Sequence, residues 1–440
     1  MWRRLLQRST PDCLRRQKHN DMGNQARILV VGTADTKADE LLYLQACIEK
    51  VGGTALIMDV GVLGEPPFTP AYSKHDVAAA IGITNDDIIA LGDEHKAMMR
   101  QAEAATALAV QLERDGKIDG MLAIGGSMAT DLALDVADAL PLGVPKVIVS
   151  TIAFSPVIPP ERIPPDAMML LWAGGLYGLN SVCRSVLSQA AGAAVGAVQG
   201  RELANSDKPL VGMTSLGSSS LKYMVRLKPE LEDRGFELAV FHTTGMGGRA
   251  LESLSKKGQF AAVMDFSLIE VSNEVQGSVV SAGADRLEAA GQAGVPQIVA
   301  PGGVTLVDLQ TWKEVPQQFA EREFHIHNRL IACAKLNADE RVQAAETIAA
   351  KLMKAKGPTA FIMPRKGIDE WDREGGPFHD DEGLNAFADA IRHSVRPPVE
   401  LIELDAHIND QEFATAVLEI FDGWINDGII KTEAATCSPQ

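Results

Sequence analysis

The 440-residue sequence has few aromatic residues and no long uncharged apolar run. Aromatic residues make up 5% of the chain whereas hydrophobic residues make up 46%, so aliphatic side chains must fill most of the interior. No apolar segment reaches the roughly 18–20 residues of a membrane-spanning helix, so we expect no membrane partner. The length is sufficient for two or three domains, each with its own core.

The five cysteines are scattered, and none belongs to a C-x-x-C pair. An odd number of isolated cysteines argues against both a disulfide framework and a structural zinc site. We therefore expect a reducing, cytoplasmic environment. No group of histidines and acidic residues has a spacing specific for metal ligands, so no metal-ligating residues are predicted.

The net charge is −17, and no long basic stretch offsets it, which argues against nucleic acid as a partner. The exception is the segment at 1–25, where six arginines and lysines stand against two aspartates. This segment lacks the apolar core of a secretory signal, so we interpret it as a disordered basic extension.

Short apolar runs alternate with helical patterns through nearly the whole chain. The predicted strands lie at 27–31, 54–60, 118–124, 145–150, 209–214, 236–242, 260–266, 296–300, 359–363 and 399–404. The helices predicted in the first half lie at 37–51, 94–114, 129–140 and 180–200. This alternation is typical of α/β folds with parallel sheets. We predict two Rossmann-like domains at 26–205 and 206–430, a ligand cleft between them, and a tail at 431–440.

The first strand runs directly into a small polar loop and a helix. Its aliphatic residues at 28–31 do not alternate with polar ones, which indicates a strand buried on both faces. Glycine permits close approach of the backbone to a ligand, and N–H groups at a helix start favour an anion. We therefore predict a phosphate site formed by Gly32, Thr33, Asp35, Thr36 and Lys37.

A second loop of the same kind follows the strand at 118–124. The carboxyl ends of parallel strands meet at one edge of a sheet, so we expect both loops to contact one ligand. The residues assigned to this half of the site are Gly125, Gly126, Ser127, Met128, Ala129 and Thr130. Asp59 ends the strand at 54–60, a position typical of an acid that binds ribose, although a solvated strand-end aspartate is an alternative.

A third glycine-rich loop offers a different function. No G-x-x-x-x-G-K-S/T motif is present, which excludes a P-loop site. Gly245, Gly247 and Ala250 do match G-x-G-x-x-G/A after a predicted strand, and Asp265 follows about 20 residues later. This pattern supports an NAD(P)-linked oxidoreductase as the alternative.

The residues around that loop also suit a small anionic metabolite. His242 and Arg249 are candidates to bind it, with Asp265 or Glu270 as a base, and these four are the predicted catalytic residues. A strand-end histidine bonded to backbone is an equal alternative for His242. The predicted substrate-binding residues are Ser218, Ser219, Gly245, Gly247, Gly248, Ser281, Gly302 and Gly303. The segment at 281–286 is expected to start a helix.

Several motifs together resemble one family. They are Gly32-Thr33-Ala34-Asp35-Thr36-Lys37, Gly125-Gly126-Ser127, Gly178-Leu179-Asn180-Ser181-Val182-Cys183-Arg184, the loop at 242–249, Ser281-Ala282-Gly283-Ala284-Asp285-Arg286-Leu287, Gly375-Gly376-Pro377-Phe378 and Ala406-His407-Ile408-Asn409-Asp410. In this order they resemble a largely uncharacterised family of two-domain ATP-binding proteins, which is related to the N-terminal half of a plant tobamovirus-resistance protein.

The resemblance implies ATP with Mg²⁺ on the first of two Rossmann-like domains, and a homodimer. It implies no known reaction. Met128 and Ala129 stand where relatives tend to carry glycine, so two side chains are expected beside the triphosphate.

The leading expectation is an ATP-binding protein, an enzyme of phosphoryl-transfer or ligase type acting on a small anionic metabolite. The oxidoreductase is the second expectation. The third is a non-catalytic module in which bound nucleotide orders the dimer for a partner.

Overall fold

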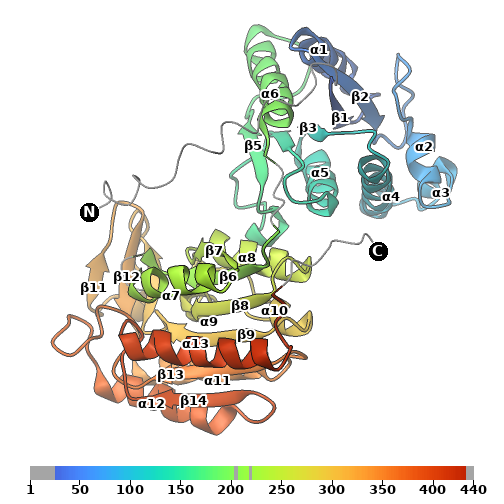
Figure 1. Cartoon of the computed structure of the whole chain (residues 1–440). Helices are drawn as coiled ribbons and strands as arrows, with labels where there is room; N and C mark the ends of the chain where they lie inside the picture. Colours follow the sequence, from blue (N-terminus) through green and yellow to red (C-terminus); the bar gives the residue numbers. More distant parts are fainter. Residues whose placement is uncertain (1–24, 203–206, 218–220, 433–440) are drawn as a thin grey trace. The chain divides into compact units, whose positions relative to one another are not determined.

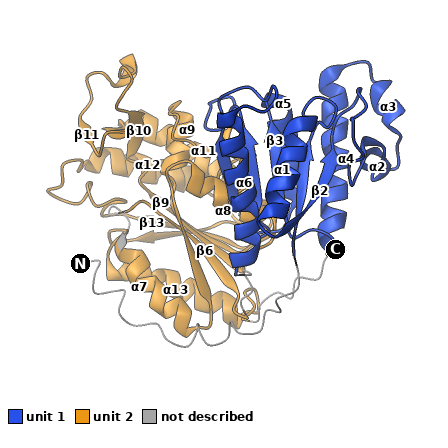
Figure 2. Cartoon of the chain, turned by 90° about the horizontal axis from the view of Figure 1, so that it is seen from above, with its two compact units in different colours: residues 1–158, 166–203 blue, residues 159–165, 204–440 orange. Residues whose placement is uncertain are grey.

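The computed structural model describes residues 25–202, 207–217 and 221–432, which form two compact units (Figures 1 and 2). Unit 1 comprises the described residues of 1–158 and 166–203, and unit 2 those of 159–165 and 204–440. Residues 1–24 of the expected extension lie outside the described residues. So do 203–206 at the expected boundary and 433–440 of the expected tail.

Unit 1 is a parallel five-stranded sheet with helices on both faces. Its strands are β1 (Ala26–Gly32), β2 (Gly53–Asp59), β3 (Gly120–Gly125), β4 (Lys146–Ser150) and β5 (Ala167–Leu171). Its helices are α1 (Ala38–Lys50), α2 (Lys74–Ala79), α3 (Asn85–Ile89), α4 (Glu94–Arg114), α5 (Ser127–Ala139) and α6 (Ser181–Gly200). The strand order is β2-β1-β3-β4-β5, and every neighbouring pair is parallel.

Strand β1 is aliphatic throughout because both faces of the sheet are covered. Ile28 and Val30 belong to the core formed with α1 and α6. Leu29 and Val31 point to the opposite face, since side chains alternate along a strand, and they are equally buried. Helices α4 and α5 pack together, and α5 contacts β3 and β4.

Unit 2 contains a parallel six-stranded sheet in the order β14-β13-β9-β8-β6-β7. These strands are β6 (Leu210–Ser215), β7 (Glu237–His242), β8 (Ala262–Ser267), β9 (Gln297–Gly302), β13 (Thr359–Pro364) and β14 (Glu400–Leu404). The helical elements are η3 (Pro160–Arg162), α7 (Leu221–Asp233), α8 (Met246–Lys256), α9 (Ile269–Val275), α10 (Ala289–Gln292), η5 (Gln317–Phe319), α11 (Ala338–Leu352), α12 (Asp381–Ser394) and α13 (Gln411–Asn426). One face is packed with aromatic rings, where Phe266 makes edge-on contacts with Tyr223 and Phe413.

A small antiparallel sheet, absent from the sequence prediction, follows β9 in unit 2. Its strands are β10 (Leu306–Gln310), β12 (Ile331–Lys335) and β11 (Phe324–Ile326), in that order. Each strand has five residues or fewer, too short for a clear alternation of polar and apolar residues.

The predicted fold class is confirmed, because both large sheets are parallel and their strands alternate with helices along the chain. One local prediction is wrong: residues 281–286 form a loop, and the next helix, α10, begins only at Ala289. Gly283 and Leu287 have φ values of 97° and 74°, which no right-handed helix accommodates. None of the described helices is long and apolar enough to span a bilayer.

Candidate functional site

The carboxyl edge of the unit 1 sheet has a topological switch point between β1 and β3. From β1 the chain proceeds to β2 on one side, and it then returns to β3 on the other. In open α/β sheets, ligands bind outside the strand ends at such a point. The two predicted phosphate loops leave the sheet here. They follow β1 and β3, which are neighbouring parallel strands with Val31 opposite Ala123.

The helices that follow these two loops begin without a side-chain cap. In α1 and α5, no described side chain accepts a hydrogen bond from the first-turn N–H groups as a cap. The other four helices of unit 1 are capped, by the side chains of Ser73, Thr84, Asp93 and Asn180. The first turn of a helix leaves N–H donors unpaired at its positive end. The two uncapped starts therefore offer an anion site at adjacent strands.

The loop after β1 is held in shape by the carboxylate of Asp59. Its Oδ1 accepts hydrogen bonds from the N–H of Ala34 and of Gly61, each at 2.9 Å. Within the loop, the hydroxyls of Thr33 and Thr36 lie 2.7 Å apart. Asp59 is fully buried and its carboxylate joins two loops. The alternative of a solvated aspartate at the strand end is therefore wrong.

Lys37 lies at the start of α1, beside an aromatic ring. Its ammonium is 5.4 Å from the centroid of Tyr177. The segment carrying Tyr177 is anchored by the next residue, since the N–H of Gly178 donates to Oε1 of the buried Glu40 at 2.9 Å. The cation is thus kept near the uncapped N–H groups of the same helix.

In the second loop, the side chains of Ala129 and Thr130 contact the ends of β3 and β4. A Cβ on Gly125 would lie 2.1 Å from Cβ of Ala129, so Ala129 packs on the strand end. Thr130 is buried and its hydroxyl lies 2.7 Å from that of Ser150. Met128 lines a hollow between α4 and α5. Gly126 and Ser127 remain as the backbone of the uncapped turn.

Asp35 and Asp59 form a pair of neighbouring carboxylates beside the first loop. A Cβ on Gly61 would lie 3.0 Å from Oδ1 of Asp59 and 3.2 Å from Oδ1 of Asp35, and one on Gly64 would lie 2.5 Å from Oδ2 of Asp35. Burial raises the pKa of Asp59, and the negative charge of Asp35 raises it further. The second oxygen of Asp59, Oδ2, is buried without a hydrogen-bond partner among the described residues.

The segment under Asp35, residues 61–64, is fixed by buried side chains from three helices. Lys74 donates to the carbonyls of Leu63 and Gly64, and Asn85 and Gln101 donate to those of Val62 and Gly61. No pattern in the sequence identifies this arrangement, because the three donors are spread over 28 positions and belong to separate helices.

In unit 2, a carboxylate from the chain itself occupies the glycine-rich loop at 245–250. Oε1 of Glu270 accepts hydrogen bonds from the N–H of Gly245 at 2.7 Å and of Gly248 at 3.1 Å. A Cβ on Gly248 would lie 1.7 Å from Oε2 of Glu270, and one on Gly247 would lie 1.9 Å from the carbonyl oxygen of His242. These N–H groups are the donors that a dinucleotide fingerprint offers to pyrophosphate.

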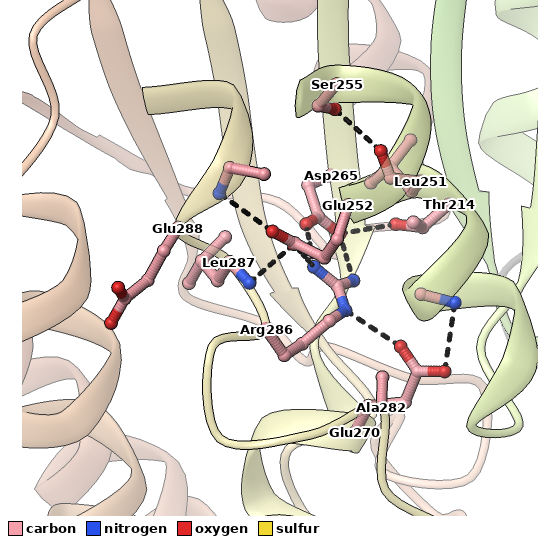
Figure 3. A network of polar contacts seen from close by, with 12 residues as sticks. Thr214, Leu251, Glu252, Ser255, Asp265, Glu270, Ala282, Arg286, Leu287 and Glu288 are labelled. Atoms are coloured by element: carbon pink, nitrogen blue, oxygen red, sulfur yellow. Dashed lines mark hydrogen bonds and ion pairs between the residues drawn. The ribbon is translucent and has the colours of Figure 1, made fainter. Parts of the chain in front are cut away.

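Glu270 is part of a buried ionic network centred on Arg286 (Figure 3). The guanidinium donates to both oxygens of Asp265, at 2.5 and 2.8 Å, to Oε2 of Glu270 at 2.8 Å and to Oε1 of Glu252 at 3.2 Å. Glu252 also accepts from the N–H of Leu287. Burial raises the pKa of Glu270 and of Glu252, while Arg286 opposes that rise.

The remaining predicted residues of unit 2 do not form one open site. The charge of Arg249 is paired with Asp285 at 2.5 Å. Burial raises the pKa of Asp285, but Arg249 and Lys256 outweigh burial and lower this pKa to about 2. Nδ1 of the exposed His242 lies 3.2 Å from the carbonyl oxygen of Ser215. The hydroxyl of Ser281 donates to Glu274.

Gly302 and Gly303 are buried against β8 and α9, where a Cβ on Gly302 would lie 2.1 Å from the carbonyl oxygen of Phe266. Ser218 and Ser219 lie outside the described residues. In the part of the chain that the structure describes, no three His, Cys, Asp or Glu residues are grouped to hold a metal ion.

These observations define a two-unit α/β protein. Its first unit has two helix starts without a side-chain cap at neighbouring strands, and in its second unit Glu270 occupies the glycine-rich loop. Residues 26–203 match the N-terminal domain of the Uncharacterised protein family (UPF0261), and residues 208–425 match the C-terminal domain of the same family. The chain belongs to the UPF0261 family.

Relatives share both units. A UPF0261 protein of Brucella melitensis is 56% identical over 407 residues, covering 92% of this chain and 97% of its own length. One from Clostridium tetani is 36% identical over 396 residues, covering 89% and 97%. The ToMV resistance protein Tm-1(GCR237) of Solanum lycopersicum is 29% identical over 432 residues, covering 90% of this chain and 56% of that protein. The predicted relationship to a plant tobamovirus-resistance protein is confirmed.

Solved structures are similar only at a low level. The glycosyltransferase SsfS6 of Streptomyces sp. SF2575 has a TM-score of 0.20 at 15% identity, covering 64% of this chain and 83% of that one. MurG of Acinetobacter baumannii has a TM-score of 0.19 at 12% identity, covering 92% of each chain. Similarity at this level carries no argument about function.

Replacement of Arg286 by methionine is expected to lower the free energy of unfolding by about 3–5 kcal/mol, because it leaves buried carboxylates without their cation. Urea denaturation followed by circular dichroism measures the change. The exposed Arg329→Met is the control, and we expect it to cost within about 0.5 kcal/mol. Equal costs for the two variants would show that the network does not stabilise unit 2.

Proposed function

We propose that unit 1 binds ATP, with its phosphates at the N-termini of α1 and α5. The observation that supports this most directly is the pair of uncapped helix starts at the β1/β3 switch point. Phosphate oxygens accept hydrogen bonds from N–H groups in such positions, and the helix dipole favours their charge. The contrast with unit 2 strengthens the proposal, since Glu270 occupies the comparable donors there.

Met128 and Ala129 leave room for the phosphates. Ala129 packs back on Gly125, and Met128 lines the α4–α5 hollow, so neither side chain needs to cover the first turn of α5. Ser127 contributes a hydroxyl there. The departure from glycine in the sequence is therefore compatible with a triphosphate.

Lys37 is the cation that we assign to the phosphates. It is the N-cap residue of α1, and its ammonium makes a cation–π contact with Tyr177. The ammonium can pair with a bound anion while it keeps this contact. Thr33 and Thr36 present hydroxyls from the same loop. Charge-assisted hydrogen bonds of this kind are roughly twice as strong as neutral ones.

The Mg²⁺ that the family resemblance implies fits the carboxylates of Asp35 and Asp59. Mg²⁺ is usually held by one or two carboxylates together with substrate phosphates. Oδ2 of Asp59 is buried and has no donor among the residues that the structure describes, and a cation would supply the missing partner. When bound, the ion neutralises phosphate charge. Asp59 also keeps the loop after β1 in place through Ala34 and Gly61.

Phosphoryl transfer is the reaction class that we propose for this site. It depends on positioning and charge stabilisation by helix starts, a lysine and a metal ion. Unit 1 has the two helix starts and Lys37, and Asp35 and Asp59 are the residues that would hold the ion. Asp265, Glu270 and Arg249 do not enter the proposal, because their charges are paired within unit 2.

Lys37→Ala is expected to weaken ATP binding by about 1–3 kcal/mol, the value of a charge-assisted hydrogen bond. Isothermal titration calorimetry with ATP and Mg²⁺ measures the loss. Lys50→Ala, at the exposed far end of the same helix, is the matched control and should keep wild-type affinity. Wild-type affinity in the Lys37 variant would remove this residue from the site.

Mg²⁺ is expected to increase the ATP affinity of the wild type. In Asp59→Asn we expect this increase to be about tenfold smaller, which corresponds to about 1.4 kcal/mol. The asparagine keeps an acceptor oxygen for Ala34 and Gly61 but removes the charge. Titrations with Mg²⁺ and with EDTA separate the two effects, and Asp39→Asn on the exposed side of α1 is the control. An unchanged ratio of the two affinities would contradict the assignment of Mg²⁺ to Asp59.

A further inference from the structure

A pocket lies between the first turns of α4 and α5 in unit 1. Its volume is about 210 Å³. The lining residues are Glu94, His95, Met98, Ala102, Met128, Asp131 and Leu132. None of them belongs to the phosphate loops except Met128, so the pocket is a separate space that begins where the second loop ends.

The pocket adjoins the proposed phosphate site through Met128, the one lining residue that belongs to the second loop. Met128 is the second residue of α5 and follows the uncapped turn at Gly126 and Ser127. Helix α4 leads into the amino end of β3, so its first turn lies at the carboxyl edge of the sheet, as the first turn of α5 does. A molecule bound at the helix starts can therefore extend into the pocket.

The size of the pocket restricts what it can hold. Sites for complete small ligands enclose roughly 300–1,000 Å³. A pocket of about 210 Å³ is smaller than this range, so it accommodates one part of a nucleotide rather than the whole. The rest of the molecule must lie outside, on the side of the loops.

The chemistry of the walls indicates which part enters. Ala102 and Leu132 are buried, and the flexible thioethers of Met98 and Met128 are suited to the face or edge of a flat ring. The acidic groups at the pocket, Glu94 and Asp131, repel phosphate and accept hydrogen bonds from amino groups. A flat, amino-bearing ring satisfies both conditions.

We propose that this pocket binds the nucleobase of the nucleotide whose phosphates lie at α1 and α5, and that Glu94 and Asp131 select a base with an exocyclic amino group. The inference rests on the proposed function and adds the specificity of the site. It assigns Met98 and Met128 to the walls around the ring. The base and the phosphates are thereby held by different parts of unit 1.

The first test fills the pocket without touching the phosphate loops. Met98→Trp places an indole in the pocket, and Met99→Trp places the same ring on the neighbouring exposed position, which is 51% exposed and outside the pocket. Calorimetry compares ATP with inorganic tripolyphosphate on both variants and on the wild type. We expect Met98→Trp to reduce ATP affinity at least about tenfold while tripolyphosphate affinity and the Met99 variant stay unchanged.

The second test needs no bulky substitution. ITP, in which oxygen replaces the amino group of adenine, is expected to bind the wild type about tenfold more weakly than ATP. Asp131→Asn should reduce this preference.

The outcomes separate the inference from the proposed function. If Lys37→Ala weakens ATP binding but Met98→Trp does not, and ITP binds as well as ATP, the base lies elsewhere and the phosphate site stands. If the wild type binds neither ATP nor tripolyphosphate, both proposals fail.

Discussion

A buried carboxylate that accepts hydrogen bonds from backbone N–H groups organises each unit of this protein. In unit 1, Asp59 joins the loops after β1 and β2 through Ala34 and Gly61. In unit 2, Glu270 holds the turn into α8 through Gly245 and Gly248. Buried backbone donors must be paired, so the chain conformation in both places depends on these acids.

The two carboxylates differ in what they leave unsatisfied. Glu270 is neutralised by Arg286 and both of its oxygens are bonded. Asp59 keeps one oxygen without a partner among the described residues, and the nearby Asp35 adds a second negative charge. Unit 1 thus combines an unsatisfied carboxylate oxygen with two helix starts that lack a side-chain cap. In unit 2 the N–H donors of the glycine-rich loop are already paired with Glu270, which is why our functional proposal concerns only unit 1.

The sequence predicted the parts that depend on local patterns. Aliphatic runs and helical periodicity identified the main parallel strands, and glycine with hydroxyl residues at strand ends identified the loops of the switch point. The glycine pattern at 245–250 was equally clear, but the acid that contacts it arrives from α9. Likewise, 281–286 resembles a helix start, while Glu252 bonds the backbone that follows it. Such distant side chains, and pockets between helices, follow from packing rather than from local sequence.

The side chain of Glu270 behaves as a tethered ligand. A free anion at a helix start is governed by its concentration, whereas a carboxylate on the same chain has a fixed, high effective concentration that dilution does not change. The turn into α8 therefore keeps its order whatever solutes surround the protein. The first-turn N–H groups of α1 and α5 have no side-chain cap. Under our proposal, mass action therefore links the stability of unit 1 to the supply of ligand.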